Sequence, residues 1–150
     1  MKKANGAGLA ANQIYSNHRI CVLEIVNNER YNYLPEIPLK ILINPKIKIN
    51  DYKNTFNSYE GCLSVPNLRG KVKRFSSINV EYYDENANFK TENIQGLASI
   101  VYQHEIDHLD GVIFTDKVQE NKSLVTYSNF IKYCAEDYSK ELENFIKSFN

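Results

Sequence analysis

The order of apolar and polar residues along the chain predicts strands first and helices afterwards. Residues 20–26 form a β-branched run of strand length, and residues 39–49 alternate between apolar and polar side chains. Residues 77–84 and 89–94 look like strands on either side of the turn-forming segment 85–88. That arrangement predicts a β-hairpin.

The apolar spacing becomes helical between Gln95 and about Leu109. Five residues at i, i+3, i+4, i+7 and i+11 share one helical face: Leu97, Ile100, Val101, His104 and His108. A second helix is predicted over residues 122–148, where a wide apolar stripe favours packing against the core. Contact with a dimer partner or a membrane is the less favoured use of that stripe.

Composition limits the class of protein. A chain of 150 residues with 43% hydrophobic residues can bury one core, so we expect one domain over residues 1–150. Eighteen basic and eighteen acidic residues are scattered, which argues against nucleic-acid binding. No apolar stretch is long enough to span a bilayer. Three cysteines argue against a disulfide framework and favour a reducing, cytosolic environment.

The segment "YQHEIDHLDG" carries two of the three histidines of the chain. Residues four apart on a helix project from adjacent turns, so His104 and His108 could hold one metal ion between them. Glu105 lies at the edge of the same face, where a carboxylate could act on metal-bound water. This is the H-E-x-x-H arrangement. The alternative is a surface helix with chance histidines, but the apolar residues on the same face favour metal binding.

A site of this kind needs a third protein ligand. Cys62 has a distinctive context, because "EGCLSVP" contains a glycine and a proline and indicates a tight loop or strand end. Cys21 and Cys134 lie in apolar patterns typical of the core. His18 lies in a polar segment where solvent exposure is the default. The acidic residues downstream of the motif are ordinary helix charges.

Three motifs resemble those of the peptide deformylase family, and they occur in the family's order. They are "GAGLAANQ" at 6–13, "EGCLS" at 60–64 and "QHEIDH" at 103–108. The resemblance extends from about Gly6 into the C-terminal helix. It implies an α+β fold with antiparallel strands around a metal-bearing helix, followed by a C-terminal helix. It also implies hydrolytic removal of the N-formyl group from the N-terminal formyl-methionine of newly synthesised proteins, with release of formate.

The resemblance also implies a metal set and catalytic residues. The ligands are Cys62, His104 and His108, with water in the fourth position. We expect one divalent ion, ferrous iron first, with zinc, nickel and cobalt as alternatives. The resemblance implies that Glu105 accepts a proton and later donates it. It also implies that the Gln13 amide and the Leu63 backbone N–H donate hydrogen bonds to the formyl oxygen.

The substrate contacts implied by the family fall into three groups. Ala7, Gly8 and Gly61 would line the path of the peptide backbone, and Leu97, Ile100 and Val101 would form the methionine pocket. Arg69 resembles the family's substrate-side arginine, which could meet peptide carbonyls or a C-terminal carboxylate. Behind the site, Asp107 would pair with Arg74 and steady the helix.

The expected partners are N-formyl-methionyl nascent peptides near the ribosome. We expect a cytoplasmic protein, a monomer rather than a dimer, with no direct nucleic-acid or membrane contact. Two alternatives remain: a deformylase-like module that binds metal and peptide with little or no turnover, and a general metalloprotease built on the same helix. Dependence on an N-formyl group would exclude the protease.

Two departures from the family pattern raise expectations of their own. Family members usually begin several dozen residues earlier with a strand and a helix, so this chain resembles an N-terminally shortened form, for which we expect exposed apolar surface or weaker stability. Ala7 stands where the family more often has a branched aliphatic residue, which could widen the pocket.

Overall fold

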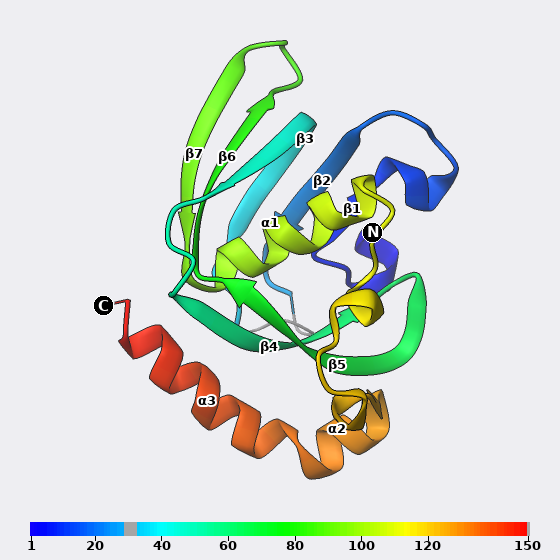
Figure 1. Cartoon of the computed structure of the whole chain (residues 1–150). Helices are drawn as coiled ribbons and strands as arrows, with labels where there is room; N and C mark the ends of the chain where they lie inside the picture. The colour runs from blue at the N-terminus through cyan, green and yellow to red at the C-terminus, as the bar shows by residue number, and fades with distance from the viewer. Residues whose placement is uncertain (29–32, 150) are drawn as a thin grey trace.

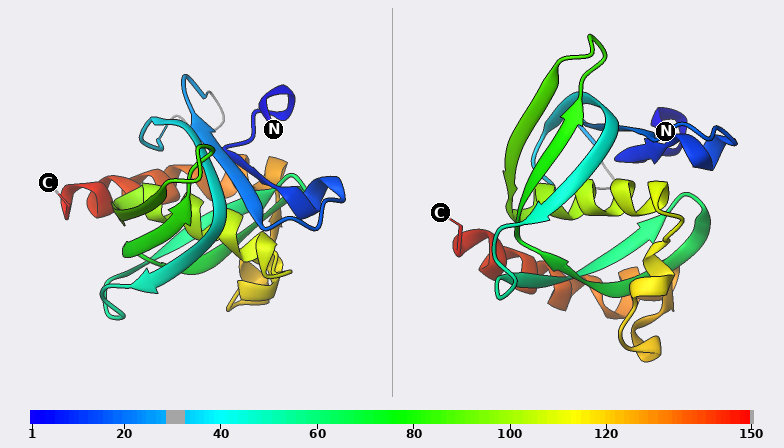
Figure 2. Two further views of the ribbon diagram at one scale, coloured as in Figure 1. Left: turned by 90° about the horizontal axis from the view of Figure 1, so that it is seen from above. Right: turned by 45° about the horizontal axis from the view of Figure 1, so that its top comes forward.

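Two antiparallel sheets enclose one central helix. The structure is a computed structural model and describes residues 1–28 and 33–149. A five-stranded sheet lies on one side of helix α1 (Gly96–Leu109), and a three-stranded sheet lies on the other (Figures 1 and 2). The predicted metal-bearing helix is therefore the middle layer of the molecule.

The larger sheet has the order β1-β2-β3-β6-β7. Its strands are β1 (Gly8–Ala10), β2 (Ile20–Ile25), β3 (Ile37–Ile49), β6 (Ser77–Tyr83) and β7 (Phe89–Gln95). The predicted strands over 20–26 and 39–49 are confirmed by β2 and β3. The predicted hairpin is confirmed as well, since β6 and β7 pair from Ser77 opposite Gln95 to Tyr83 opposite Phe89.

The smaller sheet positions the cysteine of the second motif. Its order is β4 (Thr55–Cys62), β5 (Val65–Phe75) and β8 (Val125–Thr126). Cys62 is the last residue of β4 and pairs with Val65 across a tight turn. The predicted strand end is therefore correct, but Cys62 is also buried within a small apolar cluster. Side chains alternate along a strand, so Ser58, Glu60 and Cys62 share its buried face.

Helix α1 ends at a well-defined motif. Gly111 adopts φ +75°, its N–H donates to the His108 carbonyl, and the Val112 N–H donates to the Asp107 carbonyl. This pair of bonds is a Schellman motif, which favours glycine at the left-handed position. The end of the helix is therefore fixed directly after His108 and Leu109.

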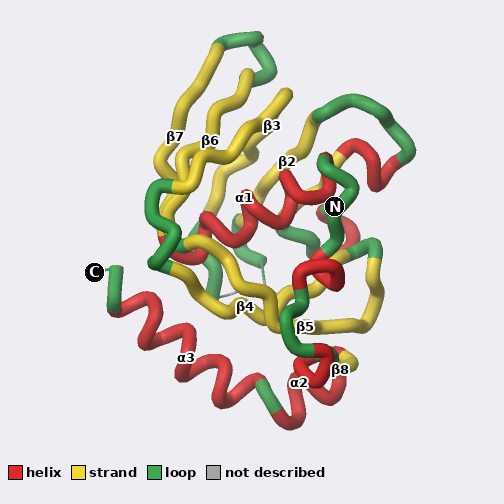
Figure 3. Tube along the Cα trace, in the orientation of Figure 1, coloured by secondary structure: helices red, strands yellow, loops and turns green. Residues whose placement is uncertain are grey.

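The predicted single helix over residues 122–148 is wrong. The segment contains a 3₁₀ turn, η5 (Asn121–Ser123), the strand β8, and two helices, α2 (Tyr127–Tyr133) and α3 (Ala135–Lys147) (Figure 3). Residues 125–126 pair with β5 as a strand, so the first part of the predicted helix is not helical. A break at Cys134, where φ is −122°, separates α2 from α3.

The core has a part on each side of α1. The main cluster joins the larger sheet to Val101, Tyr102 and Ile106 of the helix. A second cluster joins Leu97 and Ile100 to Tyr138 and Leu142, so α3 packs against the first half of α1. The predicted core position of Cys21 is confirmed, whereas Cys134 is only half-buried, because it lies at the break between α2 and α3.

Short 3₁₀ turns complete the fold. They are η1 (Lys2–Ala4), η2 (Ala11–Ile14) and η4 (Phe114–Lys117). Over residues 1–28 and 33–149, none of the helices has the length and apolar character needed to cross a membrane. All three cysteines are free.

Candidate metal centre and active site

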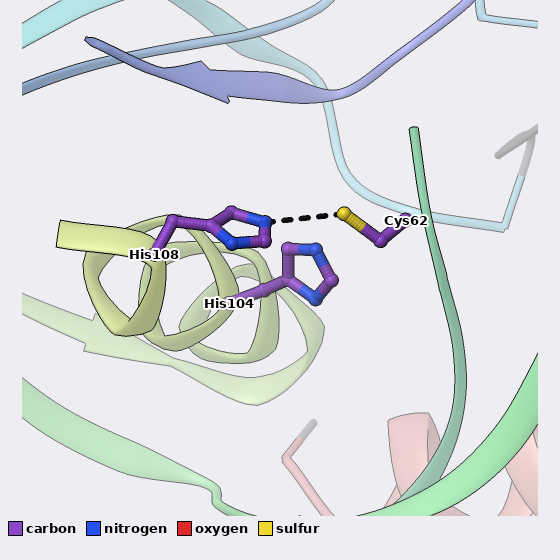
Figure 4. A group of neighbouring side chains, drawn as sticks. All are labelled: Cys62, His104 and His108. Carbon is purple, nitrogen blue, oxygen red and sulfur yellow. Dashed lines mark hydrogen bonds between the residues drawn. The ribbon is translucent and has the colours of Figure 1, made fainter. Parts of the chain in front are cut away.

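The end of β4 meets one face of α1 at a cluster of three potential metal ligands. The ligand atoms of Cys62, His104 and His108 all lie within 4.8 Å of one another. Cys62 Sγ is 3.2 Å from His108 Nε2, and the His104 ring stands edge-on to the His108 ring (Figure 4). The helical spacing of four and the strand end thus bring one sulfur and two ring nitrogens together.

The electrostatics of this cluster suit a cation. Burial raises the pKa of the Cys62 thiol, but hydrogen bonds to His104 and His108 outweigh it and lower that pKa to about 5. Burial opposes charge on His104, yet its bonds to Cys62 and Glu60 raise its pKa to about 10. A thiolate beside two imidazoles is a donor set that divalent metals accept. The residues present therefore fit a divalent ion, whose positive charge would replace that of the bound proton.

Glu60, for which no role was predicted, lies directly behind the cluster. His104 Nδ1 lies 2.8 Å from Glu60 Oε2, which leaves Nε2 for a metal. Arg74 donates to both Glu60 oxygens, at 2.7 and 2.8 Å, and to Asp107 Oδ2 at 2.5 Å. The pair expected between Asp107 and Arg74 is thus part of a larger buried network. One feature of the sequence could have indicated the position of Glu60: it lies two residues before Cys62, so the two side chains share one face of a strand.

Glu105 is fully enclosed next to the three ligands. It is 5% exposed, and its Oε2 has no hydrogen-bond partner among the residues that the structure describes. Burial and the nearby Cys62 and Glu60 charges raise the pKa of Glu105 against the opposing effect of the histidines. Gly8 of β1 leaves room for this carboxyl group, because a Cβ at Gly8 would lie 2.4 Å from Glu105 Cδ. A buried carboxyl group with a free oxygen is suited to accept and return a proton.

Gln13 directs the nitrogen of its amide toward the cysteine. The Ala10 N–H donates to Gln13 Oε1 at 2.8 Å, which fixes the orientation of the amide. Gln13 Nε2 then lies 3.6 Å from Cys62 Sγ and 2.9 Å from Ser64 Oγ. The donor that the family motif implied therefore faces the ligand cluster. Leu63, between Cys62 and Ser64, lines the same pocket.

A pocket adjoins the cluster and continues along α1. It encloses about 630 Å³ of space, a figure that includes open solvent at its mouth. The predicted substrate contacts that line it are Ala7, Gly8, Gly61, Leu97, Ile100 and Val101. The lining also includes Tyr33, Ser58 and Tyr59, which were not predicted. Ser58 and Tyr59 directly precede the second motif on β4, but only the fold shows that this strand borders the pocket.

Arg69 lies beside this pocket rather than in its lining. Its guanidinium packs against Gly61, where an added Cβ would lie 1.6 Å from a guanidinium nitrogen, and stacks over the Tyr127 ring at 4.7 Å. Arg69 and Tyr127 border an adjoining hollow that also touches Leu63. Asp107 and Arg74 are likewise outside the pocket, behind the ligands.

An H-E-x-x-H helix completed by a cysteine, beside a largely apolar pocket, defines a metal-dependent hydrolase. The model of one protein family, polypeptide deformylase, matches residues 1–124. "Peptide deformylase 2" of Nostoc sp. is 38% identical over 85% of this chain and 71% of its own length. "Peptide deformylase" of Leptospira biflexa is 42% identical over 81% of this chain and 68% of its own length.

Solved structures agree with these relatives. The class I type b peptide deformylase of Acinetobacter baumannii, bound to Met-Ala-Ser, superposes with a TM-score of 0.72 at 34% identity, covering 79% of this chain and 74% of that one. A peptide deformylase from Synechococcus elongatus with actinonin superposes with a TM-score of 0.71 at 36% identity, covering 82% and 62%. The chain belongs to the polypeptide deformylase family. Family, fold class and activity, the hydrolytic removal of the N-formyl group from nascent peptides, are as predicted.

Proposed function

We propose that one catalytic domain over residues 1–150 removes the formyl group of N-formyl-methionyl peptides at the cluster of Cys62, His104 and His108. The observation that carries this assignment is the position of Glu105. Its unpartnered carboxyl oxygen lies among the three ligands, at the lining of an apolar pocket. A single apolar pocket beside a proton acceptor suits a substrate with an apolar side chain next to the bond that breaks.

Glu105 would move the proton in both halves of the reaction. A divalent cation held by the three ligands would supply Lewis-acid chemistry, activating water and polarising the formyl carbonyl. Glu105 accepts the proton of the attacking water and then delivers it to the departing methionine amine. Its raised pKa favours holding that proton between the two steps.

Gln13 and Leu63 would stabilise the charge that develops on the formyl oxygen. The Gln13 amide nitrogen already faces Cys62, and the Leu63 backbone lies next to that ligand in the chain. Such donors act because they are in place before the charge forms. Removing one of them typically costs on the order of 3 kcal/mol of transition-state stabilisation.

The peptide would run from the pocket toward Arg69. Leu97, Ile100 and Val101 hold the methionine side chain, while Ala7, Gly8 and Gly61 allow its backbone to approach. The Acinetobacter baumannii relative was captured with Met-Ala-Ser bound, which supports a tripeptide product here. The guanidinium of Arg69, which packs beside Gly61, would meet the downstream end of such a peptide.

Ferrous iron is the metal we propose. One thiolate and two imidazoles also accept zinc, nickel and cobalt, so availability decides among them. We further propose a monomer in the cytoplasm that meets formylated nascent peptides near the ribosome. Metal analysis after anaerobic purification tests the ion, and light scattering on the eluting protein tests the oligomeric state.

The deciding experiment follows formate release from formyl-Met-Ala-Ser by anaerobic, iron-loaded protein. The parent should turn over, and Glu105→Gln should lose nearly all activity while it still binds one metal. Glu143→Gln, an exposed change on α3, serves as the matched control. A folded, metal-bound parent that releases no formate would instead support a binding module. Cleavage of unformylated internal peptide bonds would support a general protease.

A further inference from the structure

The pocket next to the proposed metal ligands carries a serine hydroxyl group among its apolar lining residues. Ser58 lines the pocket together with Leu97 and Ile100. Its Oγ lies 3.1 Å from the hydroxyl oxygen of Tyr138, and the two residues are 5% and 3% exposed. Ser58 and Tyr138 come from β4 and α3, so the pair joins the pocket to the C-terminal helix.

Two hydroxyl groups in contact share one hydrogen bond and bring two protons. Whichever group donates, one O–H is left over. In residues 1–28 and 33–149 no further acceptor contacts either hydroxyl group. When Tyr138 donates, the remaining proton belongs to Ser58, which is the member that borders the pocket.

Ser58 lies at the end of the pocket that is remote from the ligands. Along β4 it precedes Cys62 by four residues on the same face, which is roughly 13 Å of strand. Leu97 precedes His104 by seven residues, or about two turns of α1. Ser58 and Leu97 are thus both separated from the ligand cluster along their own elements, and both line the pocket. A side chain that enters from the cluster would meet Ser58 with its far atoms.

We propose that the Ser58 hydroxyl, held by Tyr138, is a specificity-determining group that donates a hydrogen bond to the thioether sulfur of the substrate's methionine. This inference rests on the proposed function, because that function places an N-terminal methionine in the pocket. A thioether is a weak acceptor and a methylene group is none. The pocket therefore selects methionine over norleucine, a side chain of nearly the same shape in which the sulfur is replaced by CH₂.

Tyr138 lies outside the part of the chain that the family model matches, which ends at residue 124. Its ring packs against Tyr59 and Phe56 of β4 at centroid distances of 5.3 and 6.3 Å. The cluster of Tyr138 and Leu142 with Leu97 and Ile100 closes the same side of the pocket. The proposal thus gives α3 a role in substrate choice.

The test compares kcat/KM for formyl-Met-Ala-Ser and formyl-norleucine-Ala-Ser in the metal-loaded full chain. A weak neutral hydrogen bond predicts that the parent prefers methionine roughly threefold to fivefold. Ser58→Ala should bring that ratio to about one, partly by improving the norleucine peptide, whose CH₂ no longer faces a hydroxyl group. Ser58→Thr, which keeps the hydroxyl group, should retain the preference. Tyr138→Phe should reduce it, since the serine is then free to rotate.

A purely structural effect of Ser58 would lower both rates together and leave the ratio unchanged. An unchanged ratio in Ser58→Ala, or a parent that handles both peptides equally, would overturn the proposal. Calorimetric binding of Met-Ala-Ser and norleucine-Ala-Ser gives a second measure that needs no turnover. Preferential binding of Met-Ala-Ser without formate release would sink the proposed function and keep the role of Ser58. Equal binding with normal formate release would do the reverse.

Discussion

Glu60 and Arg74 form a two-point ion pair directly behind the metal-ligating face of α1. Arg74 Nε and one terminal nitrogen donate to the two Glu60 oxygens at 2.7 and 2.8 Å, and the side chains are 5% and 2% exposed. Burial opposes ionisation of Glu60, but the Arg74 charge and bonds from Arg74 and His104 outweigh it and lower the pKa of Glu60 to about 2. The pair joins β4 and β5 and fixes the ring of one proposed metal ligand.

Neutralising Glu60 should destabilise the protein and weaken metal binding. Glu60→Gln leaves Arg74 buried with Asp107 as its remaining carboxylate, and breaking a buried pair typically costs about 3–5 kcal/mol. It also removes the group that orients His104, a change that commonly costs about 10–100-fold in metal affinity. Urea unfolding with chelator present measures the first effect, and a competition titration with a coloured chelator measures the second.

The control for this variant is a surface ion pair of the same chemistry. Glu81 binds Lys48 on the exposed side of the larger sheet, where the Lys48 side chain is 66% exposed. Glu81→Gln should cost less than about 1 kcal/mol and leave metal affinity unchanged. Similar losses in the two variants would show that burial of the Glu60 pair has no special effect.

Gly8→Ala should disable catalysis with little effect on metal content. The new methyl group would lie 2.4 Å from Cγ and Cδ of Glu105, so the carboxyl group must move. We expect a fall of at least tenfold in formate release, because a displaced general base loses its alignment with the substrate. Gly70→Ala is the control for crowding itself, since its methyl group presses on Val118 and Leu124 and not on Glu105. It should lower stability by about 1–3 kcal/mol and spare turnover of the folded protein.

Loss of the thiolate should remove the metal. Cys62→Ala takes away one of three ligands, and we expect bound metal to fall from about one ion per chain to nearly none after dialysis. Cys134→Ala, at the break between α2 and α3, should leave metal content unchanged. Full metal occupancy in Cys62→Ala would refute the assignment of this cysteine as a ligand.

Local periodicity was sufficient to predict those elements whose conformation depends mainly on their own residues. The spacing of Leu97, Ile100, Val101, His104 and His108 predicted α1 and the face that it presents, and the structure confirms the helix. The single helix over 122–148 failed because pairing of Val125 and Thr126 with β5 is a long-range contact that no local pattern reveals. The break at Cys134 turns α3 onto Leu97 and Ile100, which is again a tertiary effect.

The same distinction explains the site. The ordered motifs pointed to the three residues that the structure brings together, but Glu60 was overlooked although it stands inside one of the motifs. Strand alternation placed it on the face of Cys62, and only the fold shows that Arg74 lies opposite. Ser58 shares that alternation, yet its partner Tyr138 is eighty residues away. Neither the Glu60–Arg74 contact nor the Ser58–Tyr138 contact can be predicted from the local sequence.

Acid should weaken the larger sheet through Glu92. This carboxylate of β7 accepts from Lys40 Nζ of β3 at 2.7 Å and from the Tyr82 hydroxyl of β6 at 2.5 Å, so it ties three strands together. Burial favours the neutral acid, but the bonds from Lys40 and Tyr82 outweigh it and lower the pKa of Glu92. A carboxylate whose pKa is lowered by folding stabilises the folded protein at pH values above its pKa in the unfolded chain, which is about 4.3. This stabilisation is lost as the pH falls through the pKa of the group in the folded protein.

Urea unfolding of the metal-free protein between pH 3 and 7 tests the contribution of Glu92. The parent should lose stability below about pH 4.5, and Glu92→Gln should show a shallower loss because its amide does not titrate. The difference between the two proteins should be largest at neutral pH and shrink as the pH falls, since the parent then gives up the bonds that the variant already lacks. Glu143→Gln, on the exposed face of α3, should follow the parent curve. If Glu92→Gln and the parent keep a constant separation across this range, the ionised form of Glu92 does not hold the three strands together.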